Sequence, residues 1–131
     1  QENFYYASKN YNFEVNPQGR SEGTYNKYAS LDDVTDPLHY YMSYIKFGIG
    51  RATSDAAHEI RDGHITREEG VQLVKKFDHE KPNHSIKATL DYLNITTDDL
   101  NAIIDGYRDR RPNLWSKTNK DWELKYAVYK K

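Results

Sequence analysis

The chain has 131 residues and a formal net charge of -1, with 19 basic and 20 acidic side chains. Because positive charge is not in excess, the composition gives no sign of a nucleic-acid-binding surface. No apolar run approaches the roughly 20 residues that a membrane-spanning helix needs. Cysteine is absent, which excludes disulfides, thiolate metal sites and cysteine nucleophiles within this sequence. The chain also contains 12 tyrosines, whose rings can supply part of a small core that is poor in aliphatic residues.

The first segment, residues 1–35, is aromatic and polar. Tyr11, Phe13 and Val15 alternate with polar residues, which predicts a short strand, and a turn is expected at 16–19 because it reads Asn-Pro-Gln-Gly. The following loop, 19–25, has Arg, Ser, Glu and Thr around two glycines. Such a loop suits a polar ligand because glycine allows close backbone approach. A solvated loop without a ligand is the alternative, and the composition favours it.

The second segment, residues 36–108, has the apolar spacing of α-helices. Helix starts are predicted at Asp36, at Thr53 or Ser54, at Thr66, at Ser85 and at Thr96. Thr66 and Thr96 each precede an acidic residue by three positions, which is typical of a capping box.

The third segment, residues 109–131, loses this period. Trp122, Leu124, Tyr126 and Val128 alternate with other side chains, which predicts a strand, with a terminal helix as the weaker alternative. The sequence therefore predicts a mainly α fold, a small bundle of about four to five helices with short peripheral strands at the two ends. The segments on either side of the bundle are expected to be its least ordered parts.

Charged residues gather at the predicted second helix. Arg51, Asp55 and Glu59 follow one another at intervals of four and share a helix face. A guanidinium beside glycines and hydroxyls can hold a carboxylate or a phosphate. The alternative is a surface ladder of ion pairs, which contributes little to stability, and spacing alone favours that alternative.

Metal binding finds little support in the sequence. Residues 62–69 resemble the second half of an EF-hand loop, but the first half lacks the carboxylates and amides that calcium requires. The five histidines form no helical pair that could bind zinc. We therefore expect no metal ligand and no catalytic residue in this chain.

Three stretches together resemble the C-terminal part of N-acetyl sugar amidotransferases. They are Gly19–Tyr25 with Ser30–Asp33, Tyr40–Tyr41 through Lys46–Thr53, and Glu59–Gly70. Members of this family serve surface polysaccharide (lipopolysaccharide) and flagellin sugar biosynthesis, including pseudaminic-acid-type sugars. The resemblance implies an ATP-dependent reaction in which an acetamido group is adenylated and then attacked by ammonia from a glutaminase subunit, giving an acetamidino group.

The resemblance also implies what this chain lacks. The family's Ser-Gly-Gly-x-Asp-Ser loop for ATP and its cysteine pairs for zinc belong to an N-terminal nucleotide-binding domain of the ATP-pyrophosphatase type, and neither is present here. The chain is therefore expected to be a C-terminal fragment that is cytoplasmic and inactive alone, with no cofactor of its own. ATP, with magnesium and zinc, is implied only for the other domain.

The expected partners are that nucleotide-binding domain, a glutaminase subunit and a free or nucleotide-linked N-acetyl sugar, with no nucleic acid and no membrane. The residues expected to face the sugar or the nucleotide domain are Arg20, Ser21, Glu22, Thr24, Arg51, Thr53, Asp55 and Glu59. In this hypothesis, the two arginines meet substrate carboxylate or phosphate groups. The acidic residues Glu22, Asp55 and Glu59 bind hydroxyls or orient the arginines.

Two alternatives remain open at this stage. The chain could be a docking module for a glutaminase subunit or for self-association, with Tyr5, Tyr6, Trp115 and Trp122 as exposed aromatic contacts. It could also be a free-standing helical adaptor unrelated to the enzyme.

Overall fold

The computed structural model describes residues 2–29, 32–119 and 121–130. Ser30 and Leu31, which belong to one stretch of the family resemblance, lie outside the described residues. The helices are α1 (Glu2–Tyr11), α2 (Asp36–Phe47), α3 (Arg51–Arg61), α4 (Arg67–Phe77), α5 (Ile86–Leu93) and α6 (Thr97–Asp109). Two strands follow, β1 (Trp115–Lys117) and β2 (Trp122–Leu124). The prediction of a mainly α fold is confirmed.

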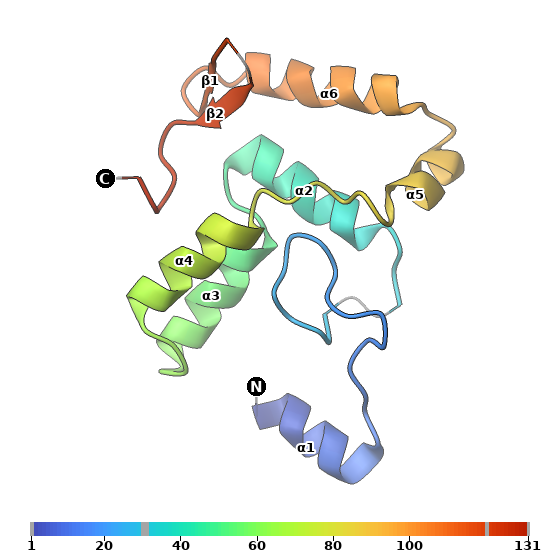
Figure 1. Ribbon diagram of the computed structural model, residues 1–131, viewed down its shortest axis with the longest axis vertical. Helices are drawn as coiled ribbons and strands as arrows, with labels where there is room; N and C mark the ends of the chain where they lie inside the picture. The colour runs from blue at the N-terminus through green and yellow to red at the C-terminus, as the bar shows by residue number, and fades with distance from the viewer. Residues whose placement is uncertain (1, 30–31, 120, 131) are drawn as a thin grey trace.

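Helix α2 lies at the centre of the molecule (Figure 1). It contacts α3, α5 and α6, while α3 and α4 lie side by side as a pair. The main apolar core forms where α2 meets α5, α6 and the two strands. Its buried members are Leu38, Tyr41, Tyr44, Ile45, Leu90, Leu100, Ile104, Trp115, Leu124 and Ala127. Three of these ten residues are aromatic, so aromatic rings supply part of the core in this chain, which is poor in aliphatic residues.

The strand prediction at the C-terminal end is confirmed for Trp122 and Leu124 but not for Tyr126 and Val128, which follow the strand, and the prediction at the N-terminal end is wrong. The C-terminal strands pair antiparallel, with Trp115 opposite Leu124. At the N-terminal end no strand forms among the described residues: Tyr11 closes helix α1, and Asn12 takes the left-handed conformation at φ 53°. A left-handed residue at this point breaks the extended backbone that an alternating strand needs. The predicted turn is present, because Gln18 N donates to Asn16 Oδ1 at 3.0 Å.

Two predicted helix starts need correction. Thr35, and not Asp36, is the N-cap of α2, and Pro37 lies in its first turn. Helix α3 begins at Arg51 after Gly50, two residues before the expected threonine. The reason is that a carboxylate far along the chain, that of Asp78, caps α3 in place of a local hydroxyl.

The other starts agree with the sequence. Both predicted capping boxes form: Glu69 N donates to Thr66 Oγ1 at 3.2 Å, and Asp99 N donates to Thr96 Oγ1 at 3.1 Å. Ser85 precedes α5 as expected, although its side chain makes no capping hydrogen bond.

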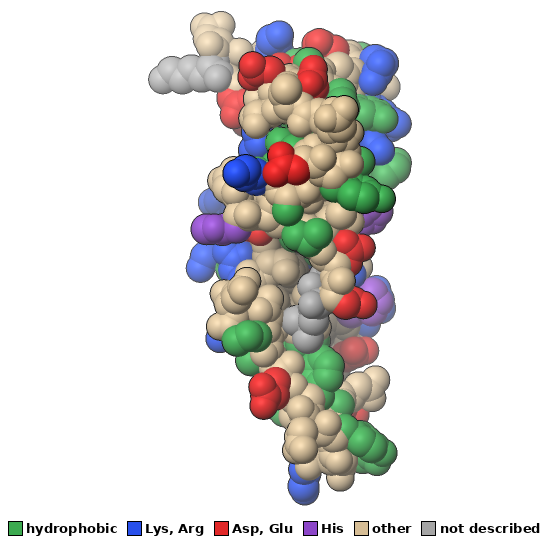
Figure 2. Space-filling model, turned by 90° about the vertical axis from the view of Figure 1, so that its right-hand side faces the viewer, with side chains coloured by type: hydrophobic (Ala, Val, Ile, Leu, Met, Phe, Trp, Pro, Cys, Tyr) green, Lys and Arg blue, Asp and Glu red, His purple; other side chains and the backbone are tan. Residues whose placement is uncertain are grey.

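Helix α1 lies apart from the other helices (Figure 1). None of its residues is buried, and its main anchor is Phe4, whose ring stacks on Tyr28 with centroids 4.5 Å apart. On the face shown in Figure 2, hydrophobic side chains lie in small groups between charged ones. No helix among the described residues is long and apolar enough to cross a membrane.

Candidate functional site

The structure brings together the two segments that the sequence singled out, the loop 19–25 and the start of α3. The backbone amide of Ala52 donates to the carbonyl oxygen of Gly23 at 3.0 Å. The hydroxyl of Thr24 donates to Asp55 Oδ2 at 2.7 Å, and Thr24 is fully buried. A buried carboxylate requires such partners, so this contact fixes the loop against the helix.

Both candidate arginines are held by carboxylates. Arg51 Nε donates to Asp55 Oδ1 at 2.9 Å, one turn along α3. Arg20 makes a bidentate pair with Glu80, with Nη1 and Nη2 at 2.6 and 2.7 Å from its two oxygens. The Arg20 guanidinium also lies 4.5 Å from the centre of the Phe77 ring. The bidentate pair makes Arg20 a poor anion site, because an incoming anion must compete with Glu80, whereas Arg51 is paired through Nε only.

Glu80 also fixes the backbone of the loop. Its Oε2 accepts a hydrogen bond from the Gly23 amide at 3.1 Å, in addition to the pair with Arg20. Burial raises the pKa of Glu80, but the hydrogen bonds from Arg20 and Gly23 and the charge of Arg20 outweigh it and hold the pKa below its ordinary value. Glu80 is therefore charged in the folded protein at neutral pH.

Thr53 helps to cap the N-terminal end of α3 by donating hydrogen bonds to Asp78. The Asp78 carboxylate accepts from the backbone amides of Gly50 and Thr53 at 2.8 and 2.9 Å, and from the Thr53 hydroxyl at 2.8 Å. Asp78 is only 4% exposed, and a side chain at Gly50 would meet it, since a Cβ there would lie 2.6 Å from Asp78 Oδ1. The carboxylate thus replaces the missing amide partners of a helix N-terminus and balances the helix dipole.

Glu59 lies one turn beyond Asp55. Its Oε2 accepts from the Tyr25 hydroxyl at 2.9 Å. Burial, together with the hydrogen bond and charge of Glu59, raises the pKa of Tyr25 well above its ordinary value. The phenol therefore stays protonated and remains a hydrogen-bond donor throughout the physiological range.

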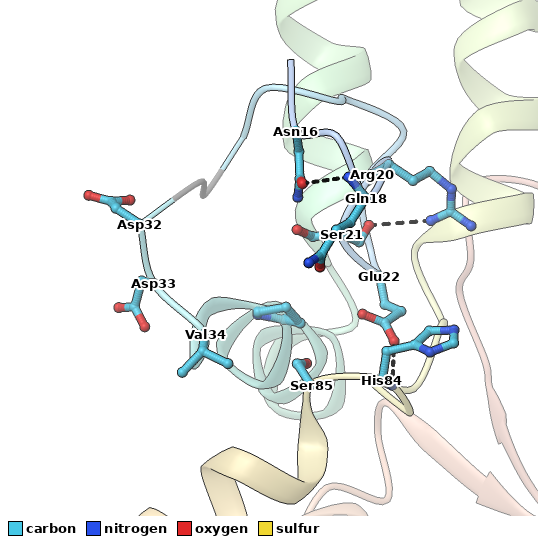
Figure 3. Close-up of a pocket in the computed structure, with 11 residues that line it drawn as sticks. Asn16, Gln18, Arg20, Ser21, Glu22, Asp32, Asp33, Val34, His84 and Ser85 are labelled. Carbon is cyan, nitrogen blue, oxygen red and sulfur yellow. Dashed lines mark hydrogen bonds between the residues drawn. The ribbon is translucent and has the colours of Figure 1, made fainter. Parts of the chain in front are cut away.

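A polar cavity of about 590 Å³ opens beside the loop (Figure 3). It is bounded by the turn and loop from Asn16 to Glu22, by residues 32–34 before α2, and by His84 and Ser85 before α5. Of the eight predicted residues, three line it, namely Arg20, Ser21 and Glu22. The other five, Thr24, Arg51, Thr53, Asp55 and Glu59, lie behind or beside the loop and make the contacts described above.

The charge of this cavity is mainly negative. Its lining carries the carboxylates of Glu22, Asp32 and Asp33, while the positive charge of Arg20 is paired with Glu80. Hydrogen bonds from Thr35 hold the pKa of Asp33 below its ordinary value. The lining therefore suits hydroxyl and N–H donors better than it suits phosphate or carboxylate groups.

Glu22 is the lining residue whose position is best defined. Its Oε1 accepts from the backbone amide of His84 at 2.8 Å, which ties the loop to the segment before α5 (Figure 3). This leaves Oε2 without a hydrogen bond to the described residues. Glu22 thus joins two walls of the cavity and can also accept a hydrogen bond from a ligand.

Sequence reasoning missed three residues that build this region: Asp78, Glu80 and His84. They follow α4, whereas their partners lie 25 to 62 positions earlier in the chain. The local signal in the sequence was that the carboxylates of Asp78 and Glu80 follow Phe77, the last apolar residue of α4. The dipole at the C-terminal end of a helix favours cations, so two carboxylates at this position indicate contacts with another part of the chain.

Trp115 needs correction as a candidate docking residue. It is only 3% exposed, and its indole N–H donates to the Ile45 carbonyl oxygen at 2.9 Å. Tyr5 and Tyr6 are exposed as expected, at 65% and 61%.

The described residues include no group of three His, Asp or Glu side chains placed to hold a metal ion.

Comparison with known proteins identifies the class. Residues 22–129 match the family model described as "LPS biosynthesis protein WbpG-like, C-terminal domain". The match starts at Glu22 and includes the cavity wall before α5, α3 with its capping carboxylate, and both strands. The chain therefore belongs to this family of C-terminal domains of lipopolysaccharide biosynthesis proteins. No curated protein matches the chain.

Proposed function

We propose that this domain forms part of the sugar-binding surface of an ATP-dependent amidotransferase that makes an acetamidino sugar for surface polysaccharide or flagellin. The family supports a role in lipopolysaccharide biosynthesis. The resemblance of 19–25, 40–53 and 59–70 to N-acetyl sugar amidotransferases supports the reaction class. The single observation that supports a sugar-facing role is the cavity, which the predicted loop lines with carboxylate and hydroxyl groups.

In the proposed reaction, the acetamido oxygen attacks the α-phosphorus of ATP and pyrophosphate leaves. Ammonia then adds to the activated carbon, and AMP leaves with the oxygen. ATP would bind in the nucleotide-binding domain of the same protein, and ammonia would come from a glutaminase. The residues of this domain would bind and orient the sugar, with Glu22 accepting from a sugar hydroxyl or the acetamido N–H.

The structure changes the roles proposed for the arginines. Arg20 and Arg51 are paired with Glu80 and Asp55, so we assign them to holding the loop and α3 in place. Thr24, Thr53, Asp55 and Glu59 belong to the same support. The residues proposed to touch the sugar are thus Ser21 and Glu22, together with the amides of Asn16 and Gln18.

The reaction is tested with the full-length protein, an N-acetyl sugar nucleotide, ATP and ammonium chloride. We expect the acetamido oxygen to be replaced by NH, as seen by mass spectrometry and ¹³C NMR, with one AMP formed per product. Release of AMP without a new amidine, or no turnover with any N-acetylated sugar nucleotide, would rule out this function.

A docking role is the second candidate, and the exposure of Tyr5 and Tyr6 on α1 favours it. Binding of the purified chain to the glutaminase subunit by calorimetry, lost in a Tyr5→Ser/Tyr6→Ser variant, would support it. Equal binding by this variant and the wild-type chain would count against α1 as the contact.

A further inference from the structure

A groove at the junction of α2 and α3 differs in chemistry from the cavity described above. It has a volume of about 380 Å³, and Tyr40, Ser43, Phe47, Ile49, Arg51 and Ser54 are among its lining residues. No lining residue carries a carboxylate, whereas the polar cavity has three. The two hollows therefore suit ligands of different charge.

The apolar part of the groove is exposed and held in place. Phe47 and Ile49 are 60% and 54% exposed and flank Gly48, which ends α2 in the left-handed conformation at φ 71°. The turn is fixed on both sides, because Gly48 N donates to the Tyr44 carbonyl oxygen and Gly50 N to Asp78, each at 2.8 Å. Two large apolar side chains are thus presented to solvent on a rigid turn, which lowers the entropic cost of binding.

Positive charge borders these apolar side chains. The Arg51 side chain is 39% exposed; its Nε pairs with Asp55, and its terminal nitrogens make no hydrogen bond with the described residues. Asp55 is 7% exposed and also bonds Thr24 in the interior, so the cation is the more exposed member of the pair. The Arg111 guanidinium lies 5.9 Å from the centre of the Phe47 ring. A carboxylate in the groove can therefore reach the Nη atoms of Arg51 without displacing Asp55 from Nε, while Arg111 borders Phe47 but does not line the groove.

We propose that this groove is a docking site for a protein segment that presents an acidic side chain between apolar side chains. The volume accommodates one or two side chains, and the exposed Phe47 and Ile49 match apolar neighbours. Asp55 holds only the Nε of Arg51, so the Nη atoms of this side chain match a carboxylate. A free phosphate or carboxylate would leave the apolar pair uncovered, which is why a polypeptide is the better match. The site does not depend on the amidotransferase reaction proposed above.

The test uses the ¹⁵N-labelled 131-residue chain and the peptide acetyl-Leu-Glu-Trp-Glu-Leu-amide, followed by NMR titration. We expect the largest amide shifts at Phe47, Ile49, Gly50 and Arg51. The same peptide with Gln for both Glu residues should bind about fivefold more weakly, since one partly screened charge contact is worth about that factor. Inorganic phosphate is titrated as a separate probe.

Variants make the assignment specific. Phe47→Ser should weaken the peptide by about tenfold, because an exposed aromatic anchor is removed. Tyr92→Ser is the matched control, since Tyr92 is an exposed aromatic side chain on α5. It should leave binding unchanged. The proposal would be overturned if the Glu and Gln peptides bound with equal affinity, or if both variants lost the same affinity. It would also be overturned if the amide shifts were absent or centred outside the groove, or if phosphate bound more tightly than the peptide.

Discussion

Replacing Asp78 with alanine is the most informative single perturbation of this domain. The side chain is 4% exposed and accepts three hydrogen bonds from the start of α3 at 2.8 to 2.9 Å. Hydrogen bonds to a charged group contribute roughly 1.5–3 kcal/mol each, but neighbouring bonds are not additive. We therefore expect Asp78→Ala to lower the free energy of unfolding by about 3 kcal/mol. That is a large share of the roughly 5–15 kcal/mol typical of a domain.

The assay is urea unfolding followed by far-ultraviolet circular dichroism, with linear extrapolation to water. Asp78→Asn keeps one acceptor oxygen and should lose roughly half as much. Asp91→Ala is the control, because Asp91 is an exposed carboxylate on α5. It should change stability by less than about 0.5 kcal/mol. If Asp78→Ala resembles this control, the carboxylate does not support α3 and the reasoning fails.

Three further predictions concern the loop, the core and α1. The folded state lowers the pKa of Glu80 below its ordinary value of 4.5. The pairing of Glu80 with Arg20 therefore stabilises the fold fully at pH values above 4.5. This stabilisation is lost as pH falls through the lower folded-state pKa; Glu80→Gln should flatten this part of a pH–stability curve, and an unchanged curve would contradict it. Gly48→Ala should lower the melting temperature by several degrees, because φ is 71° and a Cβ would lie 2.9 Å from two leucine side chains; an unchanged melting temperature would be inconsistent with this turn. In amide exchange, residues 2–11 should exchange fast and 22–26 slowly, and equal protection would argue against a loop fixed to α3.

The parts of the fold that were predictable are those encoded within a few residues. The capping boxes at Thr66 and Thr96 place side chain and backbone three positions apart, so the sequence alone defines both helix starts. The start of α3 could not be found in this way. Its cap, Asp78, lies 25 positions beyond Thr53, and no local pattern announces that contact.

The same distinction holds for the candidate site. The sequence singled out the loop 19–25 and the start of α3 as candidates for facing the sugar or the nucleotide domain. It did not indicate that the two segments contact each other, because Thr24 bonds Asp55 across 31 positions. It did not indicate that Arg20 would be paired, because Glu80 is 60 positions away. Alternation at 11–15 suggested a strand, but a strand needs a partner, and the left-handed Asn12 interrupts the extended backbone there.

The proposal that the polar cavity faces the sugar is tested most directly by narrowing that cavity in the full-length enzyme. Ser21→Trp places a large ring on the lining, and Ala102→Trp, on the exposed face of α6, is the control. We expect Ser21→Trp to raise the KM for the N-acetyl sugar substrate at least about tenfold, equivalent to about 1.4 kcal/mol of lost binding, with the KM for ATP unchanged. Unchanged sugar kinetics in Ser21→Trp, or an equal effect in Ala102→Trp, would show that the sugar binds elsewhere.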